Sequence, residues 1–186
     1  MLNFKRITLT AAAIAMSTVL SSASFAANPD VGGAPMYESK NIVENAVNSK
    51  DHTTLVAAVK AAGLVETLAS DGPFTVFAPV NAGFEMLPDG TVETLLKPEN
   101  KAMLTKVLTA HVIAGKISTE DLVAWAKAKG GRYNMQTVSG DALTAVVKGK
   151  NLFIFDESGG AAKVTISDVN QSNGVIHVVD HVLVPR

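Results

Sequence analysis

The sequence contains no cysteine, and this absence excludes several kinds of site. Disulfides, thiolate metal centres, a cysteine nucleophile and a lipid anchor on an N-terminal cysteine all need a thiol. The folded chain must therefore be held together by its hydrophobic core alone. Its 186 residues, 47% of them hydrophobic, are enough to build one.

Long hydrophobic runs are also scarce, apart from one near the start of the chain. Lys5 and Arg6 precede a 14-residue apolar stretch, and Ser24-Phe25-Ala26 then places small residues at the −3 and −1 positions of a cleavage site. This pattern predicts a secretory signal peptide over residues 1–26, because the stretch is too short for a membrane anchor. We therefore expect an exported protein, periplasmic or secreted, whose mature chain begins at Ala27.

A basic tract is missing as well. Removal of residues 1–26 takes away two of the 16 basic side chains and none of the 17 acidic ones, so the net charge becomes 14 − 17 = −3. A mildly acidic domain without a basic tract lacks the electrostatic footprint of a nucleic-acid-binding protein. The mature chain contains no apolar run of 18 residues, so we expect no integral membrane anchor after signal cleavage.

The stretch from 72 to 88 organises the rest of the chain. Residues 74–78 form a β-branched and aromatic run, which predicts a strand buried on both faces. Pro79 should end this strand because proline cannot donate to a sheet ladder. Asn81 is placed to cap a following helical turn in which Phe84 faces inward.

Helices are predicted on both sides of this strand. A Pro/Gly-rich lead over 27–36 predicts a flexible tether. Asn41 and Glu44 form a capping pair, and Asp51 can cap a second helix that Gly63 ends. Later helical patterns begin after the strand and continue to residue 129, with a capping box at Ser118-Asp121.

From residue 132 the apolar period changes from helical to two. Short strands separated by turn signals are predicted over 135–138, 142–147, 152–155 and 164–166. The last stretch, 173–185, contains a further strand that is apolar on both faces. Helices followed by a meander predict one α+β domain.

Three segments together resemble the motifs of the fasciclin (FAS1) domain. They are GPFTVFAPVNAGFEMLP at 72–88, LTAHVIAGKI at 108–117 and SNGVIHVVDHVLVP at 172–185. The resemblance covers residues 37–186 and is strongest to the small exported single-domain members of bacteria. The resemblance implies a β-sandwich or wedge decorated by helices of the N-terminal half, and a role in adhesion or extracellular interaction. Its structural signature residues are Phe74, Phe77, Pro79, Asn81, Phe84, Asn173, Gly174 and His177.

The resemblance also implies candidate partner-binding residues. Animal matrix members use a tyrosine–histidine pair and an aspartate–isoleucine pair that are associated with integrin binding. The matching positions here are Ala110-His111 and Asp168-Val169, so half of each pair differs. The candidates are therefore His111, Asp168 and Val169, and the expected partner is a surface protein, a polysaccharide or a second copy of the chain. The alternatives are a hydrogen-bonded core histidine at 111 and a turn-capping aspartate at 168.

No metal site, cofactor or catalytic centre is predicted. His177 and His181 are four residues apart on a predicted strand, about 13 Å, which is too far to share one ion. The G-x-S-x-G, H-E-x-x-H and P-loop motifs do not occur in the sequence. Two functions remain: a non-catalytic interaction module, or a carrier of a small apolar ligand in a pocket between helices and sheet. Such a pocket could be lined by Met86, Met103 and Met135, although methionines more often fill a core.

Overall fold

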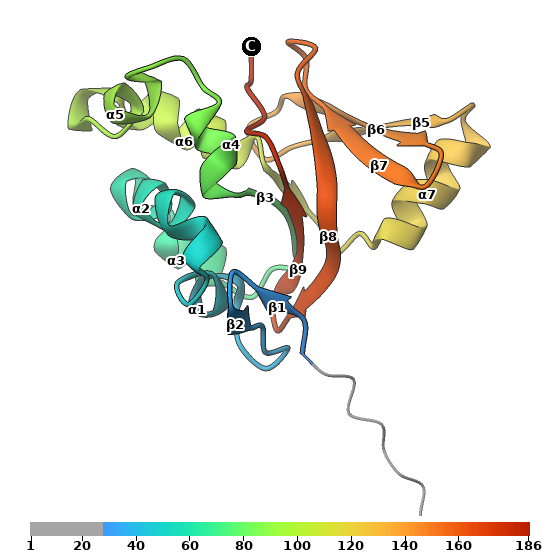
Figure 1. The fold of residues 1–186 in the computed structure, drawn as a ribbon, viewed down its shortest axis with the longest axis horizontal. Coiled ribbons are helices and arrows are strands. Elements are labelled where there is room, and N and C mark those ends of the chain that lie inside the picture. The colour runs from blue at the N-terminus through green and yellow to red at the C-terminus, as the bar shows by residue number, and fades with distance from the viewer. Residues whose placement is uncertain (1–27) are drawn as a thin grey trace, which may run out of the picture.

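The computed structural model describes residues 28–186, and Figure 1 shows how their helices and strands are arranged. The predicted signal peptide over 1–26 lies outside the described residues. The helices are α1 (Ile42–Ala46), η1 (Lys50–His52), α2 (Thr53–Ala62), α3 (Val65–Ala69), α4 (Asn81–Glu85), α5 (Thr91–Leu95), η2 (Pro98–Asn100), α6 (Lys101–Thr109) and α7 (Thr119–Ala128). The strands are β1 (Asp30–Val31), β2 (Ala34–Pro35), β3 (Phe74–Pro79), β4 (Val112–Ala114), β5 (Arg132–Gln136), β6 (Ala142–Lys148), β7 (Asn151–Phe155), β8 (Ala161–Gln171) and β9 (Gly174–Val179).

Seven of these strands form one bent sheet in the order β4-β3-β9-β8-β7-β6-β5. The long strand β8 belongs to both halves, because its beginning pairs with β7 and its end pairs with β9. The pairing of β8 with β9 shifts between Val164 and Ile166 and again between Ile166 and Val169. Because bulges bend and twist a strand, the sheet folds over along β8 into a wedge. In Figure 1 the helices α1–α6 lie to the left of β3 and β9, and the meander β5–β7 lies to the right.

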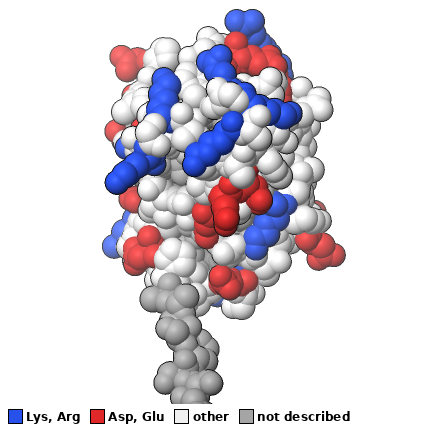
Figure 2. Space-filling model, turned by 90° about the vertical axis from the view of Figure 1, so that its right-hand side faces the viewer, with Lys and Arg blue, Asp and Glu red and all other residues white. Residues whose placement is uncertain are grey.

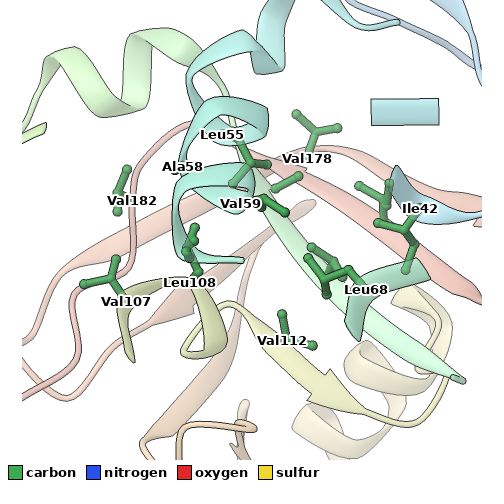
Figure 3. Packing of buried hydrophobic residues seen from close by; sticks show 14 of the residues in the cluster. Ile42, Leu55, Ala58, Val59, Leu68, Val107, Leu108, Val112, Val178 and Val182 are labelled. Carbon is green, nitrogen blue, oxygen red and sulfur yellow. The ribbon is translucent and has the colours of Figure 1, made fainter. Parts of the chain in front are cut away.

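Two hydrophobic clusters fill the two sides of the central strands. The first joins α1, α2, α3 and α6 to β3 and β9, and Figure 3 shows Leu55 and Val59 of α2 packed near Val178. The second joins Phe77 and Val179 to the inner face of the meander and to α7. Strand β9 is buried at every position, as its apolar residues on both alternations predict. Helices packed on a mixed, folded-over sheet confirm the α+β prediction.

The lead was predicted to be a flexible tether, and this prediction is wrong for most of its length. Strands β1 and β2 pair as a small hairpin, and the side chains of Val31 and Met36 are only 4% and 2% exposed. Gly32 and Gly33 form the turn with positive φ angles, a conformation that glycine adopts at little cost. The Pro/Gly-rich composition therefore marks a tight turn that folds onto the first cluster.

Helix caps follow the sequence where the capping partners are local. Asn41 and Glu44 form a complete capping box on α1, and Ser118 and Asp121 form one on α7. Hydrogen bonds from Ser118 lower the pKa of Asp121. Gly63 ends α2 in the left-handed conformation, as predicted.

Asp51 and Asn81 do not cap the helices that the sequence suggests. Asp51 lies inside η1, and α4 begins after Val80 without a side-chain cap. Asn81 instead accepts a hydrogen bond from the Thr54 N–H at 3.0 Å and donates one to the Lys50 carbonyl at 2.8 Å. It therefore caps the first turn of α2 from a distance, which satisfies an N–H that helix geometry leaves free.

Candidate functional site

His111 lies at the end of α6, inside the protein. Its Nδ1–H donates to the Val107 carbonyl at 2.8 Å, and its Nε2 accepts from the Leu183 N–H at 2.9 Å. The side chain is 3% exposed, and burial lowers its pKa to about 4 against the opposing effects of the Val107 carbonyl and the Asp156 charge. The ring therefore stays neutral and ties the C-terminal segment to α6. The prediction that His111 meets a partner at the surface is wrong for this fold, and the core-histidine alternative describes its position.

Val169 is also buried, with no exposed surface, because it follows the bulge in β8 and enters the first cluster. It cannot contact a partner in the folded protein, so this prediction is wrong as well. Asp168 is only half-buried, with φ of 56°, an uncommon angle for a residue other than glycine. Its Oδ1 accepts a hydrogen bond from the Thr119 N–H at 2.7 Å. The carboxylate thus holds the start of α7, and a role in partner binding stays a prediction.

His177 completes the link between β8, β9 and α7. Its Nδ1 accepts from the Asp168 N–H at 3.2 Å, and its Nε2–H donates to the Ile117 carbonyl at 3.0 Å. Burial lowers the pKa of His177, opposed by the Ile117 carbonyl and the Asp168 charge. Both ring nitrogens have partners only in the neutral ring. His177 is therefore a buried connector, stacked on Phe77 with ring centroids 5.6 Å apart.

Asn173 connects three elements through its amide. Its Oδ1 accepts from the Ile42 N–H at 3.0 Å, and its Nδ2 donates to the carbonyls of Leu68 and Ser70, each at 2.8 Å. Next to it, a Cβ on Gly174 would lie 2.1 Å from the Phe74 carbonyl oxygen, so only glycine fits. The other five signature residues lie in or beside the core: Phe74, Phe77, Pro79, Asn81 and Phe84. Phe74 and Asn81 are the least buried of these five.

The outer face of the meander carries polar, charged and aromatic side chains that are exposed or half-buried, around the buried Val146. Side chains alternate along each strand, and the register brings Arg132, Val146, Phe153 and Lys163 into one row across β5–β8. The neighbouring row contains Asn134, Thr144, Phe155 and Ala161. The opposite side chains, such as those of Leu143 and Ile154, enter the second cluster. We call this surface the outer meander face.

Cations surround the outer meander face. Lys148 lies over the rings of Phe153 and Phe155, with Nζ 5.6 and 5.3 Å from their centroids. Lys129 and Arg132 are exposed at the start of β5. Within residues 28–186, none of these three cations has a carboxylate oxygen within 4.0 Å. Figure 2 looks onto the side that carries α7 and the meander, and its Lys and Arg side chains gather in the upper half.

An open groove of about 610 Å³ crosses the outer meander face. Its lining combines two cations, an amide, a hydroxyl, an aromatic ring and a carboxylate, from Lys129, Arg132, Asn134, Thr144, Phe155 and Asp156. The carboxylate of Asp156 already accepts hydrogen bonds from the N–H groups of Gly160 and Val184. The groove therefore offers mainly hydrogen-bond donors and a ring.

This groove was not predicted, although the sequence contains a signal for it. Residues 122–155 contain five basic side chains and one acidic one, in a chain whose net charge is negative. The period-two pattern also assigns Arg132 and Asn134 to one face of a strand. Only the register, however, shows that they share a surface with Phe153 and Phe155.

A second, apolar cleft lies between the helices and the sheet. Its cavity of about 60 Å³ is lined by side chains of α1, α2, α3, β3 and β9, with Met36 from the lead. The methionines proposed for such a pocket lie elsewhere: Met86 and Met103 are each 60% exposed, and Met135 belongs to the second cluster. That part of the prediction is wrong. The methionine that lines the cavity is Met36, which belongs to the lead, and the lead was not expected to pack against the core.

His52 is the buried polar group at this cleft. Its Nδ1 is 2.9 Å from Ser49 Oγ, whereas Nε2 has no hydrogen-bond partner of good geometry within the described chain. Burial lowers the pKa of His52, opposed by the nearby Ala78 carbonyl and the Asp51 charge. In residues 28–186, no three His, Asp or Glu side chains are grouped so that they could hold a metal ion. No helix in this part of the chain is long and apolar enough to cross a membrane.

Comparisons with known proteins agree with the fold. The Fasciclin domain profile matches residues 50–185. Protein sll1483 of Synechocystis sp. is 46% identical over 155 residues, covering 83% of this chain and 79% of that protein. Immunogenic protein MPB70 of Mycobacterium bovis is 34% identical over 166 residues, covering 86% and 77%. Rabbit transforming growth factor-beta-induced protein ig-h3 is 35% identical over 133 residues, but these cover only 17% of its length.

A solved structure shows the same architecture. The FAS1 domain pair from the insect cell adhesion molecule Fasciclin I aligns with a TM-score of 0.69 at 17% sequence identity, over 77% of this chain and 50% of that one. The fold thus defines an α+β wedge of the FAS1 type. Because the family profile covers most of the sequence, the chain belongs to the fasciclin domain family.

Proposed function

We propose that this chain is an exported, non-catalytic interaction module that binds a surface partner through the outer meander face. The observation that carries the proposal is a sheet face without a covering element in residues 28–186, bordered by cations that have no carboxylate partners. The FAS1 domain pair that shares this fold comes from a cell adhesion molecule, which supports a role in adhesion or extracellular interaction. The export pattern over 1–26 supports a periplasmic or secreted location.

The expected partner is a surface protein, a polysaccharide or a second copy of the chain. Exposed cations steer an oppositely charged partner and raise its association rate, an effect that falls as salt screens the charges. A binding surface of this kind should therefore be sensitive to ionic strength. Self-association would appear as a concentration-dependent mass in analytical ultracentrifugation.

The test compares two triple variants of the exported chain for binding to cell envelopes of the producing organism. The first changes Lys129→Gln, Arg132→Gln and Lys148→Gln on the outer meander face. The matched control removes the same charge from the helical side, with Lys60→Gln, Lys97→Gln and Lys101→Gln, all exposed. Envelope binding should fall at least tenfold for the first variant and stay within twofold for the control. Equal binding by the two variants would place the interaction on another surface.

The apolar cleft favours a second candidate function, a carrier of a small apolar ligand. Its lining is almost entirely hydrophobic, and it lies where such a pocket was predicted, between helices and sheet. A cavity of about 60 Å³ is small, so a bound ligand would have to be slim or displace the helices. Native mass spectrometry of the purified exported chain tests this function. A co-purifying mass that is lost on denaturation supports it, and a bare-chain mass contradicts it.

A further inference from the structure

The groove on the outer meander face points to a particular partner chemistry. Its lining combines Arg132 and Lys129 with the amide of Asn134, the hydroxyl of Thr144 and the ring of Phe155. The side chains of Arg132 and Asn134 share the outer meander face, whereas the ammonium of Lys129 lies 5.3 Å from the centroid of the Tyr133 ring. Cations bind carboxylates through charge-assisted hydrogen bonds, and the arginine fork can bind both oxygens of one carboxylate. Amides and hydroxyls are hydrogen-bonding partners for sugar hydroxyls. The combination matches a polymer that carries both kinds of group.

The aromatic rings add a flat apolar surface at the same place. Phe153 and Phe155 lie side by side on the outer meander face, and both are half-buried. The negative face of an aromatic ring attracts polarised C–H groups, which line the apolar face of a pyranose ring. Nζ of Lys148 is 5.6 and 5.3 Å from the two ring centroids, so a positive charge lies close to both rings.

The row spacing suits an extended ligand. Arg132 and Lys163 are at opposite ends of one row across β5–β8, so three strand spacings of about 4.8 Å separate them by about 14 Å. Cations thus border the row at both ends with the ring of Phe153 between them. A linear chain lying across the strands could bind a charge at each end and place a sugar on the ring.

We infer that the outer meander face binds an acidic polysaccharide whose sugar rings carry carboxylates. This inference rests on the proposed function, because it names the partner for the same surface. A protein partner would need an apolar, desolvated centre, but here the charged ammonium of Lys148 lies within 5.6 Å of both ring centroids. A lipid surface would need side chains that protrude and insert, whereas Phe153 and Phe155 are half-buried in the sheet face.

The experiment measures binding of the exported chain to alginate, a polyuronate, with three comparison ligands: neutral dextran, polyglutamate and phosphatidylglycerol vesicles. Alginate should bind, dextran should not, and the other two should bind at least tenfold more weakly. Raising the salt from about 50 to 300 mM should weaken alginate binding, because screening shortens the reach of the cations. Equal binding of polyglutamate would show that the face recognises negative charge alone. Tighter binding of the vesicles would show that the face binds a membrane surface. Either result would overturn the inference.

Variants link alginate binding to the groove. The Lys129→Gln, Arg132→Gln, Lys148→Gln variant should bind alginate at least tenfold more weakly, whereas the Lys60→Gln, Lys97→Gln, Lys101→Gln control should match the parent within twofold. A second variant, Asn134→Ala with Thr144→Ala, keeps every charge and removes a side-chain pair joined at 3.0 Å. It should weaken alginate binding several-fold without changing the residual binding of polyglutamate. Circular dichroism and thermal unfolding verify that each variant is folded.

The outcomes also separate this inference from the proposed function. If the groove variant loses envelope binding but the parent does not bind alginate, the face is an interaction surface and the polysaccharide assignment is wrong. If the groove variant keeps envelope binding, the proposed function itself fails. If alginate binding is the same in the groove variant and the control, the polymer binds elsewhere and the inference is wrong.

Discussion

The backbone N–H of Asp168 donates a hydrogen bond to Nδ1 of His177, and this contact joins the bulge of β8 to β9. The carboxylate of the same aspartate accepts the Thr119 N–H at the start of α7. The residue that the family resemblance assigns to partner binding therefore holds a helix on the sheet. Its position in the left-handed region suits this task, since aspartate and asparagine adopt that conformation more readily than other residues with a Cβ.

Asp168→Ala should lower the free energy of unfolding by about 1–2 kcal/mol, because it removes a helix cap and places alanine at a positive φ. Asp168→Asn should cost less than about 0.5 kcal/mol, since its side-chain oxygen can still accept the Thr119 N–H. Urea unfolding of both variants measures the difference. An alanine variant as stable as the parent would show that the cap contributes nothing.

Acid should destabilise the protein through His111. Burial lowers the folded-state pKa of His111 to about 4, whereas an unfolded histidine titrates near 6.5. Below pH 6.5 the unfolded chain therefore binds the extra proton first, and stability that is complete above 6.5 is lost as the pH falls toward 4. At about 1.4 kcal/mol for each pH unit, the loss is about 3 kcal/mol, and the lowered pKa values of His52 and His177 act in the same direction.

Urea unfolding at pH 7.5 and pH 5 measures the part of this loss that falls above pH 5, about 2 kcal/mol. A His111→Gln variant should be less stable than the parent at pH 7.5, because the Leu183 N–H and the Val107 carbonyl lose their partner. It should, however, lose less further stability on going to pH 5. Met103→Ala, at an exposed position without a titratable group, is the control and should keep the parent's pH dependence. An unchanged pH dependence in the His111 variant would contradict the prediction.

Phe77→Ala should lower the free energy of unfolding by about 3–5 kcal/mol, because the ring is fully buried in the second cluster and stacks on His177. Phe153→Ala is the comparison, since that ring is half-buried on the outer meander face. Its loss should be less than half as large. Denaturant unfolding of the two variants measures both losses. Similar losses would mean that the burial of the ring does not determine the loss of unfolding free energy.

Met36→Ala should cost about 2–4 kcal/mol, as deletion of buried methylene groups does. The residue is 2% exposed although it lies in the lead that composition assigns to a tether. Met103→Ala, at a position that is 60% exposed, should change stability by less than about 0.5 kcal/mol. If Met36→Ala is equally harmless, the hairpin does not contribute to the core.

The exported protein should begin at Ala27, because Ser24-Phe25-Ala26 supplies the small residues of a cleavage site. The intact mass of protein recovered from the periplasm or the medium measures this. A mass that retains residues 1–26 would contradict both the cleavage and the assignment of this segment as a signal peptide.

Local patterns in the sequence predicted much of the fold. The buried strands β3 and β9, the capping boxes on α1 and α7 and the meander strands all follow from residues that are close together in the chain. The apolar periods of strands and helices, and the capping side chain that bonds an N–H three residues away, all involve residues close together in the sequence. The motif resemblance also indicated the family, because each of its three segments is an unbroken run of residues that can be compared directly.

The candidate site depended on the tertiary structure. Asn81 caps α2 rather than its own helix, and Asp168 caps α7 across 49 residues of chain. Neither partner could be identified from spacing, because a free helix N–H can be satisfied by any side chain that folding brings near it. In the same way, Arg132 and Phe153 share the outer meander face only because the register of three strands aligns them. The sequence by itself determined most of the helices, strands and core, although it did not predict the hairpin of the lead or the burial of Met36. Only the folded sheet decided which polar side chains are used inside the protein and which remain exposed, because those contacts join residues that are far apart in the chain.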